Sequence, residues 1–292
     1  MELPDLKKIT TDEIRDPLLQ NKNVQLYALR LDKIHPVISG NKWFKLKYHL
    51  DYFNAGNYSG IISFGGAWSN HIVATACICY LKKIKCTGII RGERPEEYSN
   101  TLLEAANYEM DLKFISRKTY AQKNSNEFLK WIKKEIPGHY IIPEGGAGKE
   151  GEKGAGEILQ YADEKSYTHI ACAVGTGTMF NGIRESASAD QKILGIVALK
   201  GWEVENEKNN TEMFLDYHFG GYAKYNPTLI NFMNEFFRLT NIPTDIVYTG
   251  KLVFALFDLI KKDHFPQGSK ILMIHSGGLQ GNASLQKGSL IF

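Results

Sequence analysis

The sequence predicts an α/β fold in which mostly parallel strands alternate with helices. Two segments share one pattern, which is a short apolar run, a glycine-rich turn and then a helical pattern. In the first, the apolar run at 61–64 is followed by Gly65-Gly66 and by a helix from about Asn70. In the second, an apolar run that ends at Val174 is followed by Gly-Thr-Gly-Thr and a helix. Near-continuous apolar runs are typical of strands buried on both faces, as in parallel sheets.

Five further apolar runs predict the remaining strands of this fold. In chain order they read CTGIIRG, DLKFIS, HYIIPEGG, KILGIVALKG and SKILMIHSGG. Ligands of such folds bind beyond the carboxyl ends of the strands, where the glycine-rich turns lie. The polar section at 207–213 is predicted to be an exposed loop.

The chain is longer than a single hydrophobic core usually allows, so one large or two moderate domains are expected. It has 292 residues and a mass of 33.0 kDa. No low-complexity linker and no obvious repeat divides it. Two domains would therefore be interleaved rather than joined by a flexible tether.

The composition is that of an ordinary globular protein, with 43% hydrophobic and 23% charged residues. The net charge is only +3 and lysines are spread along the chain, so nucleic-acid binding is not expected. No apolar run is long enough to span a bilayer, and the N-terminal stretch has no apolar signal-peptide core, so a cytoplasmic location without membrane contact is expected. The four cysteines are expected to be buried free thiols, and no Cys/His cluster has the spacing of a metal site.

The stretch SGNKWFKLKY, at 39–48, places Lys42 at the point where a loop ends and a helix begins. A helix N-terminus carries partial positive charge, so it is an unfavourable position for a cation. A lysine that tolerates such a position is expected to be neutral, desolvated or covalently occupied. An ordinary surface lysine is the alternative.

The loop Gly175-Thr176-Gly177-Thr178 is predicted to bind a phosphate group. It follows a strand and opens a helix, so its amides and the helix dipole favour an anion, and the threonine hydroxyls add hydrogen-bond donors. A plain tight turn is the alternative. Dinucleotide binding is disfavoured because Phe180 stands where the third glycine of that motif belongs.

Three further segments contain polar or aromatic residues beside glycine. In GGAWSNH, Ser69 is a natural helix N-cap, and the alternative is that Ser69, Asn70 and the loop amides hold a carboxylate or a cofactor. HFGGYAKY and DIVYTGK each place a tyrosine beside glycine, where packing is the usual role. IHSGG is another strand end followed by paired glycines.

Taken together and in this order, these segments resemble one family, the pyridoxal-phosphate enzymes that comprise 1-aminocyclopropane-1-carboxylate (ACC) deaminase and D-cysteine desulfhydrase. The resemblance runs from LYALRLD to HSGGLQG, and its most specific parts are SGNKWFKL, GGAWSNH and VYTGK. It implies the fold of the tryptophan-synthase β-subunit group (fold type II), with two interleaved three-layer domains. We expect residues 1–44 and 142–292 to form a large cofactor-binding domain, and residues 45–141 to form a small inserted domain.

The resemblance implies which residues bind the cofactor, pyridoxal 5'-phosphate. Lys42 matches the lysine that forms a Schiff base with it, and Lys45 would lie near its phosphate end. The loop at 175–178 matches the phosphate cradle, in agreement with the prediction made from the residues alone. Asn70 matches the residue that hydrogen-bonds the ring oxygen of the cofactor.

Four of the matching residues are implied to act on the substrate. Lys42, once free of the cofactor, would remove the α-proton, and Ser69 matches a serine that faces the substrate carboxylate. Tyr222 and Tyr248 match two active-site tyrosines. The match for Tyr222 is looser, because the spacing in GGYAKY departs from the usual one, and Tyr225 is a rival.

Two departures from ACC deaminases bear on the substrate. Those enzymes have a glutamate beside the pyridine nitrogen where this chain has Thr249, and a leucine where it has Ser276. Hydroxyl residues at both positions are similar to the D-cysteine desulfhydrase pattern. A threonine hydroxyl can donate to an unprotonated ring nitrogen but cannot neutralise a pyridinium, so it is expected to leave a weaker electron sink.

The sequence therefore predicts a lyase for a small amino acid with a β-leaving group, with D-cysteine favoured over ACC. ACC deaminase is the alternative within the family. A nucleotide-dependent oxidoreductase and a cofactor-binding protein without activity are more distant alternatives. The resemblance also implies a homodimer.

Overall fold

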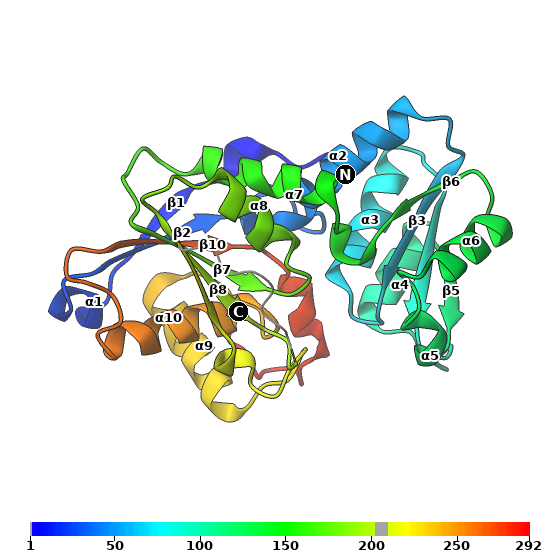
Figure 1. Ribbon diagram of the computed structural model, residues 1–292. Helices are drawn as coiled ribbons and strands as arrows, with labels where there is room; N and C mark the ends of the chain where they lie inside the picture. Colours follow the sequence, from blue (N-terminus) through cyan, green and yellow to red (C-terminus); the bar gives the residue numbers. More distant parts are fainter. Residues whose placement is uncertain (1, 202–209) are drawn as a thin grey trace.

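The structure is a computed structural model that describes residues 2–201 and 210–292, and it contains two α/β units side by side (Figure 1). The larger unit has a six-stranded sheet in the order β1-β2-β10-β7-β8-β9, and the smaller unit has a four-stranded sheet in the order β5-β4-β3-β6. Among the described residues, each strand pair is parallel except β1 with β2. The predicted α/β fold with mostly parallel sheets is confirmed.

The strands follow the apolar runs of the sequence closely. Their bounds are β1 Thr11–Ile14, β2 Gln25–Arg30, β3 Gly60–Gly65, β4 Cys86–Arg91, β5 Asp111–Ile115, β6 His139–Ile142, β7 His169–Val174, β8 Lys192–Val197, β9 Thr211–Phe214 and β10 Lys270–His275. Each of the seven predicted runs forms a strand. Strands β1, β2 and β9 were not predicted.

The prediction of an exposed loop at 207–213 is wrong for its last residues. Residues 207–209 lie outside the described residues, and Thr211 to Met213 belong to β9. This short strand pairs in parallel with β8, for example Ile193 with Thr211. It lies at the edge of the sheet, which is why a polar sequence can form it without an apolar run.

The helices fill the intervals between the strands and cover both sheets. The α-helices are α1 Pro17–Asn21, α2 Asn41–Ala55, α3 Asn70–Leu81, α4 Asn100–Asn107, α5 Arg117–Tyr120, α6 Asn126–Glu135, α7 Lys149–Gly156, α8 Thr178–Ser186, α9 Pro227–Thr240 and α10 Thr249–Lys261. Short 3-10 turns include η3 Glu144–Gly146 and η5 Asp216–His218.

The large sheet is buried on both faces because side chains alternate along its strands. On β2, Leu26 and Ala28 pack with α9 and α10 in one core, while Tyr27 and Leu29 face the opposite core. That second core is covered by α2, α7 and α8, the helices drawn above the sheet in Figure 1. The large unit therefore has three layers.

The small sheet is built in the same way. Ile61 and Ile90 pack with α3 and α4, and Ile62 and Phe64 face a separate cluster with α5 and α6. Both units therefore have the three-layer arrangement that the family resemblance implies.

Helix α2 crosses from one unit to the other. Its Phe44 packs in a core of the large unit, whereas Leu46 and Leu50 pack in the main core of the small unit. The predicted domain boundary between residues 44 and 45 falls inside this helix, and it stays a prediction. The residues that follow Gly40 on α2 are thereby held between the two units.

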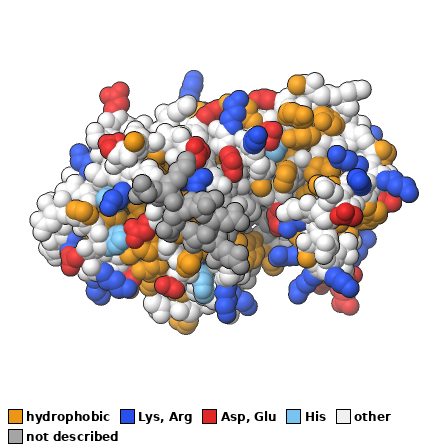
Figure 2. All heavy atoms as spheres, in the orientation of Figure 1, with side chains coloured by type: hydrophobic (Ala, Val, Ile, Leu, Met, Phe, Trp, Pro, Cys, Tyr) orange, Lys and Arg blue, Asp and Glu red, His pale blue; other side chains and the backbone are white. Residues whose placement is uncertain are grey.

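One face of the molecule carries charged side chains of both signs. On the face shown in Figure 2, Lys and Arg side chains alternate with Asp and Glu, so this face has no extended basic surface of the kind that nucleic acid requires. Within residues 2–201 and 210–292, no helix has the length and apolar character needed to cross a bilayer. In the same residues, no group of three or more His, Cys, Asp or Glu side chains is arranged to bind a metal ion.

Candidate active site

A cavity of about 970 Å³ lies between the two units, where the carboxyl ends of strands from both sheets meet. The loops after β3, β5 and β6, with Arg91 at the end of β4, line it from the small unit, and segments after β7, β8 and β10 line it from the large unit. Most of the site residues predicted from the sequence line this cavity, namely Lys42, Lys45, Ser69, Asn70, Gly175, Thr176, Gly177, Tyr222, Tyr248 and Ser276. Thr178 and Thr249 do not belong to its lining.

Lys42 is the second residue of α2 and points its amine into the cavity. Its Nζ donates a hydrogen bond of 2.6 Å to Asn41 Oδ1. Burial lowers the pKa of Lys42 to about 8, and the charge of Asp245 opposes this change only in part. The helix starts here because Gly40, at φ +63°, lets the chain turn against β10, where a Cβ would lie 1.8 Å from Ser276 O.

Lys45 lies one helical turn further along α2 and is only 7% exposed. Burial lowers its pKa to about 7, and the neighbouring charge of Lys42 lowers it further. Within the part of the chain that the structure describes, no group accepts a hydrogen bond from its amine or pairs with it. A buried amine without an acceptor is costly, so this position favours an anionic ligand.

The loop after β7 leaves the start of α8 open to a ligand. The backbone at Gly177 has φ +82°, and no side chain caps the helix. The amides of its first turn are therefore available to an anion. Gly175 has to be glycine, because a Cβ there would lie 2.9 Å from the ring of Tyr248. The hydroxyls of Thr176 and Thr178 lie 3.0 Å apart and form one polar group at the loop.

Ser69 and Asn70 begin helix α3 at the carboxyl end of β3. Ser69 is the N-cap, and its Oγ accepts a hydrogen bond from Ile72 N at 3.3 Å. The prediction that Ser69 is a helix N-cap is therefore correct. Among the described residues its hydroxyl hydrogen has no acceptor, so it can donate to a ligand. Asn70 Nδ2 donates to Gly278 O at 3.1 Å, while its Oδ1 is buried and has no partner in the part of the chain that the structure describes.

His71 was not singled out from the sequence, although it lines the cavity. Ser63 Oγ donates to Ile142 O at 3.2 Å, so it accepts from His71 Nε2 at 2.8 Å. Burial, with the charge of Lys45 next, lowers the pKa of His71 well below its usual value. The ring is therefore neutral, and its Nδ1, which has no partner, carries a lone pair.

The two predicted tyrosines meet at the large-unit side of the cavity. The rings of Tyr222 and Tyr248 are 6.4 Å apart between centroids and pack edge to face. Tyr222 Oη donates to Trp68 O of the small unit at 3.4 Å. Tyr222 is 39% exposed, but desolvation by the cavity wall, with the charge of Asp245 next, raises its pKa to about 12, and burial raises the pKa of Tyr248 well above 10. The rival Tyr225 is 46% exposed and does not line the cavity.

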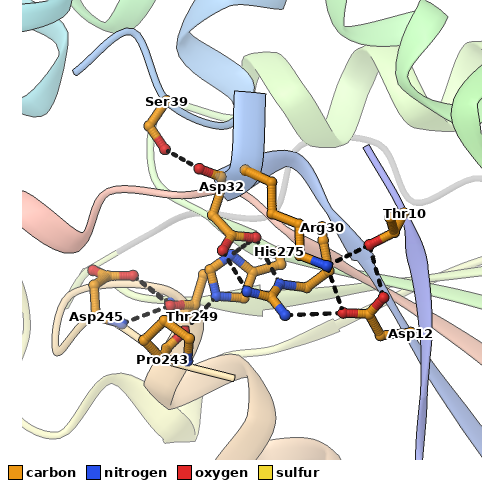
Figure 3. Close-up of polar contacts among 10 residues, drawn as sticks. Thr10, Asp12, Arg30, Asp32, Ser39, Pro243, Asp245, Thr249 and His275 are labelled. Atoms are coloured by element: carbon orange, nitrogen blue, oxygen red, sulfur yellow. Dashed lines mark hydrogen bonds and ion pairs between the residues drawn. The ribbon is translucent and has the colours of Figure 1, made fainter. Parts of the chain in front are cut away.

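Thr249 points away from the cavity and contacts Asp245 (Figure 3). Its hydroxyl donates to Asp245 Oδ1 at 2.6 Å and accepts from Asp245 N at 2.7 Å. The carboxylate of Asp245 also accepts from the amides of Val247, Tyr248 and Thr249, so it caps α10. The predicted position beside a ring nitrogen is therefore not supported, because both bonding directions of the Thr249 hydroxyl are used within this cap.

Ser276 is the hydroxyl residue that does face the cavity from the end of β10. Its backbone oxygen accepts from Asn41 N at 3.2 Å, which fixes the start of α2 against this strand. The residue before it, His275, has Nε2 at 2.7 Å from Pro243 O and Nδ1 at 3.1 Å from Asp32 Oδ1 (Figure 3). These contacts fix the backbone of Ser276 at the end of β10.

The small-unit wall of the cavity contains charged residues that the sequence did not reveal. They are Arg91, Arg117, Lys123 and Glu144, with Tyr120 among them. Lys123 pairs with Glu144 at 3.2 Å, and the guanidinium of Arg91 lies over the ring of Tyr120. Three cations against one carboxylate favour anionic ligands such as a carboxylate or a phosphate. The PEGG segment after β6 was the available signal for Glu144, since it is a strand end followed by paired glycines.

Unsatisfied groups in this cavity match the polar ends of pyridoxal 5'-phosphate. The uncapped amides of α8 and the unpaired amine of Lys45 suit a phosphate dianion. The buried Oδ1 of Asn70 lacks a partner, and the amine of Lys42 is buried with a lowered pKa. The residues present therefore fit the cofactor. The fold and this set of donors define a pyridoxal-phosphate enzyme of fold type II.

Comparison with known proteins leads to one family. No family model matches the chain. The chain is 28% identical to a protein of Pyrococcus abyssi provisionally named ACC deaminase, over 88% of this chain and 86% of the other. It is 27% identical to the bifunctional D-cysteine desulfhydrase/ACC deaminase of Arabidopsis thaliana, over 88% and 73%. The crystal structure of an ACC deaminase homologue matches with a TM-score of 0.81 at 25% identity, over 96% and 94%. These relatives and this structure support the resemblance of the chain to the ACC deaminases and D-cysteine desulfhydrases.

Proposed function

We propose that this enzyme is a lyase that removes sulfide from D-cysteine. One D-cysteine and one water give pyruvate, ammonia and hydrogen sulfide. The observation that carries the choice of substrate is Ser276, whose hydroxyl-bearing side chain lines the cavity where ACC deaminases have a leucine. Thr249 does not support the choice of D-cysteine over ACC, because its hydroxyl is bonded to Asp245.

The residues that would hold the cofactor lie on three elements. Lys45 and the amides at the start of α8 would bind its phosphate, Asn70 would contact the ring, and Ser276 would face the ring nitrogen. Bound pyridoxal phosphate supplies the electron-withdrawing ring that acidifies the α-proton of an amino acid. Ser276 can donate a hydrogen bond to a neutral ring nitrogen but cannot balance a positive one, so the electron sink stays weak.

Lys42 is the base in this proposal. With a pKa near 8, its amine is partly neutral at physiological pH and can accept a proton from Cα of the substrate. Asn41 Oδ1 accepts a hydrogen bond from the same Nζ, and this contact orients the nitrogen lone pair. The cavity wall, with its three small-unit cations, attracts the carboxylate of the substrate.

Ser69 would hold the carboxylate of the substrate. Its Oγ already accepts from Ile72 N, so the hydroxyl hydrogen is free to donate to a carboxylate oxygen. The amides of the loop before α3 lie at a helix N-terminus and favour the same negative charge.

Tyr222 and Tyr248 suit a sulfur leaving group. Both keep their protons, because burial raises their pKa values above that of a thiol. They can therefore stabilise a departing thiolate by hydrogen bonding without transferring a proton to it. ACC has no such leaving group, because opening its ring leaves the electron pair on carbon, where it requires an acid.

The test is a steady-state comparison of D-cysteine, L-cysteine, D-serine and ACC as substrates for the purified, cofactor-loaded protein. We expect sulfide and pyruvate from D-cysteine and little or no 2-oxobutanoate from ACC. Ser276→Leu is expected to lower turnover of D-cysteine at least ~10-fold, while Ser276→Thr keeps most of it. Turnover of ACC equal to or above that of D-cysteine in the wild type would make ACC deaminase the function.

The role of Lys42 has its own test. Borohydride treatment of the loaded protein should attach the cofactor to the peptide that contains Lys42, and Lys42→Ala should abolish turnover. Lys47→Ala, on the same helix and paired with Glu157 near the surface, is the matched control and should keep activity. An adduct on Lys45, or full activity in Lys42→Ala, would require another base.

We also propose that the enzyme is a homodimer in solution, on the strength of the family resemblance. Light scattering after size exclusion should then give twice the chain mass of 33.0 kDa. A mass of one chain would contradict this assembly.

A further inference from the structure

Lys251 is a buried lysine for which the proposed reaction has no use. It is the third residue of α10, and its side chain is fully buried. Burial lowers its pKa to about 8, and the charge of Asp245 opposes this change. Within residues 2–201 and 210–292 no carboxylate forms an ion pair with it.

Backbone carbonyls surround the ammonium of Lys251. Its Nζ donates to His218 O and Gly221 O, each at 2.8 Å, and lies 3.5 Å from Ala198 O. The first two oxygens belong to the turn between η5 and α9, and the third follows β8. The three oxygens converge on one point, so their partial negative charges repel one another unless a cation lies between them.

The turn has a backbone that ordinary residues adopt reluctantly. Phe219 has φ +53°, Gly220 +99° and Gly221 +119°. These angles bring the carbonyls of His218 and Gly221 to the same side of the turn. The cost of the left-handed backbone at Phe219 has to be offset by contacts, and the two short bonds from Lys251 are the strongest polar ones available to the turn.

This turn determines where Tyr222 lies, since Tyr222 follows Gly221 directly. Tyr222 packs against Tyr248, and Tyr248 precedes Lys251 by one helical turn. Tyr222 also reaches Trp68 O in the small unit. The start of α10 thus positions both tyrosines. It positions Tyr248 through the backbone of the helix and Tyr222 through the ammonium of Lys251.

We propose that Lys251 is a positioning residue, whose ammonium occupies a cage of three carbonyl oxygens and thereby fixes the turn at 216–222 and the side chain of Tyr222. The inference that this affects turnover rests on the proposed function, whereas the effect on the turn does not. A cage of carbonyls around a cation implies that a small free cation can replace the ammonium once the lysine side chain is shortened.

The experiment compares Lys251→Ala, which opens the cage, with Lys251→Met, which fills it with an uncharged chain. Hydrogen exchange of the peptide at 216–225 is measured in the apoprotein, with and without ammonium chloride, at constant ionic strength set by tetramethylammonium chloride. Exchange should become about 10- to 100-fold faster in both variants, in line with the loss of hydrogen bonds from a charged donor. Ammonium should restore protection in Lys251→Ala only.

Lys224→Met is the matched control, because Lys224 is exposed and adjacent to the same turn, with its Cβ near Gly220. It should exchange as the wild type does. In the loaded enzyme, Lys251→Ala should lose about 10- to 100-fold in kcat/KM for the accepted substrate and regain most of it with ammonium, whereas the wild type should not respond.

Unchanged exchange at 216–225 in both variants would overturn the proposal, as would equal acceleration over the whole chain or no effect of ammonium on Lys251→Ala. If Lys251→Ala does not fold without ammonium, its refolding yield against ammonium concentration is the same test, and a yield independent of ammonium contradicts the cage. If exchange behaves as expected but neither D-cysteine nor ACC is turned over, the proposed function fails and the inference about Lys251 stands.

Discussion

Two lysines one turn apart on α2 both have lowered pKa values, yet they have different partners. Lys42 has Asn41 beside it and Asp245 at longer range, whereas Lys45 lacks an acceptor among the described residues. An unpaired buried amine destabilises the apoprotein and strengthens the binding of an anion. This opposition between stability and binding can be measured at Lys45.

Lys45→Met should make the apoprotein more stable at pH 6. The pKa of Lys45 is about 7 in the folded chain and near its ordinary value of 10.5 in the unfolded chain, so the folded chain binds fewer protons between these values. The cost of Lys45 is therefore complete below pH 7 and falls as pH rises toward 10. The difference in unfolding free energy between variant and wild type, measured in urea at each pH, should shrink over that range.

The same variant should bind pyridoxal phosphate about 10- to 100-fold less tightly, because it lacks a charge-assisted hydrogen bond to the phosphate. Lys47→Met is the control for both measurements, since Lys47 pairs with Glu157 outside the cavity. Equal cofactor affinity in Lys45→Met and the wild type would show that the phosphate lies elsewhere.

Thr249→Glu should destabilise the fold rather than tune the cofactor. The glutamate would lie against the buried carboxylate of Asp245, and two like charges without water are costly. We expect a loss of about 2–4 kcal/mol in the free energy of unfolding, measured by denaturant titration. Thr249→Ser, which keeps the hydroxyl, should stay within about 1 kcal/mol of the wild type. A stable Thr249→Glu with an altered absorption spectrum of bound cofactor would place this residue at the ring after all.

At the scale of elements, the close approach of α7 to α2 supports the helix that carries Lys42. Gly154 of α7 faces the backbone of α2, and a Cβ there would lie 1.8 Å from Phe44 O. Alanine is the better helix former by about 1 kcal/mol, so propensity alone predicts that Gly154→Ala stabilises the protein. Packing predicts the opposite, because one of the two backbones has to move.

Gly154→Ala should therefore lower the free energy of unfolding by about 1–3 kcal/mol, measured in urea. Gly156→Ala tests the same helix at a looser position, where the added Cβ would lie 3.2 Å from Gly182 O, and it should have the smaller effect. A Gly154→Ala protein as stable as the wild type would mean that α2 and α7 separate easily.

At the scale of the whole molecule, a buried charge network joins segments from both ends of the chain below the cavity (Figure 3). Arg30 at the end of β2 bonds Asp32 through Nε at 2.8 Å and Nη2 at 2.6 Å, and it bonds Asp12 of β1 at 2.9 Å. Asp32 also meets His275, which precedes Ser276. The network therefore connects the ends of β1, β2 and β10 beneath the site.

Asp32→Asn should cost about 3–5 kcal/mol of stability, because it removes the buried carboxylate that Arg30 and His275 share and leaves Asp12 as the remaining partner of Arg30. Burial alone would raise the pKa of Asp32, but the charge of His275 and the bonds from Arg30 outweigh it and lower the pKa. A lowered pKa contributes stability above about pH 4 that is lost as pH falls further. The difference between wild type and variant should thus shrink below pH 4 in urea titrations.

Asp12→Asn is the control for Asp32→Asn, because it removes a more exposed carboxylate from the same network. Asp12 bonds the same arginine, but its side chain is 31% exposed, so we expect a loss nearer 1 kcal/mol. Equal effects of the two substitutions would mean that burial does not decide the strength of this network.

The strands and the ligand-binding loops followed from local sequence. Apolar runs between glycine-rich turns determine buried parallel strands because they are stable only when both faces are covered, and Lys42 could be recognised because a cation at a helix start needs an explanation. These inferences depend on neighbours in the chain, which a sequence displays directly.

Only the tertiary structure decided which way the side chains of the site point. Thr249 turns toward Asp245 instead of the cavity, Lys251 meets carbonyls some 30 residues before it, and Arg91 reaches the cavity from the small unit. Polar side chains take the partner that leaves the fewest buried groups unsatisfied, and that partner is set by which segments the fold brings together. The sequence predicted a phosphate-binding loop and a lysine for the cofactor, whereas the position of each hydroxyl and each counter-charge depended on contacts between residues far apart in the chain.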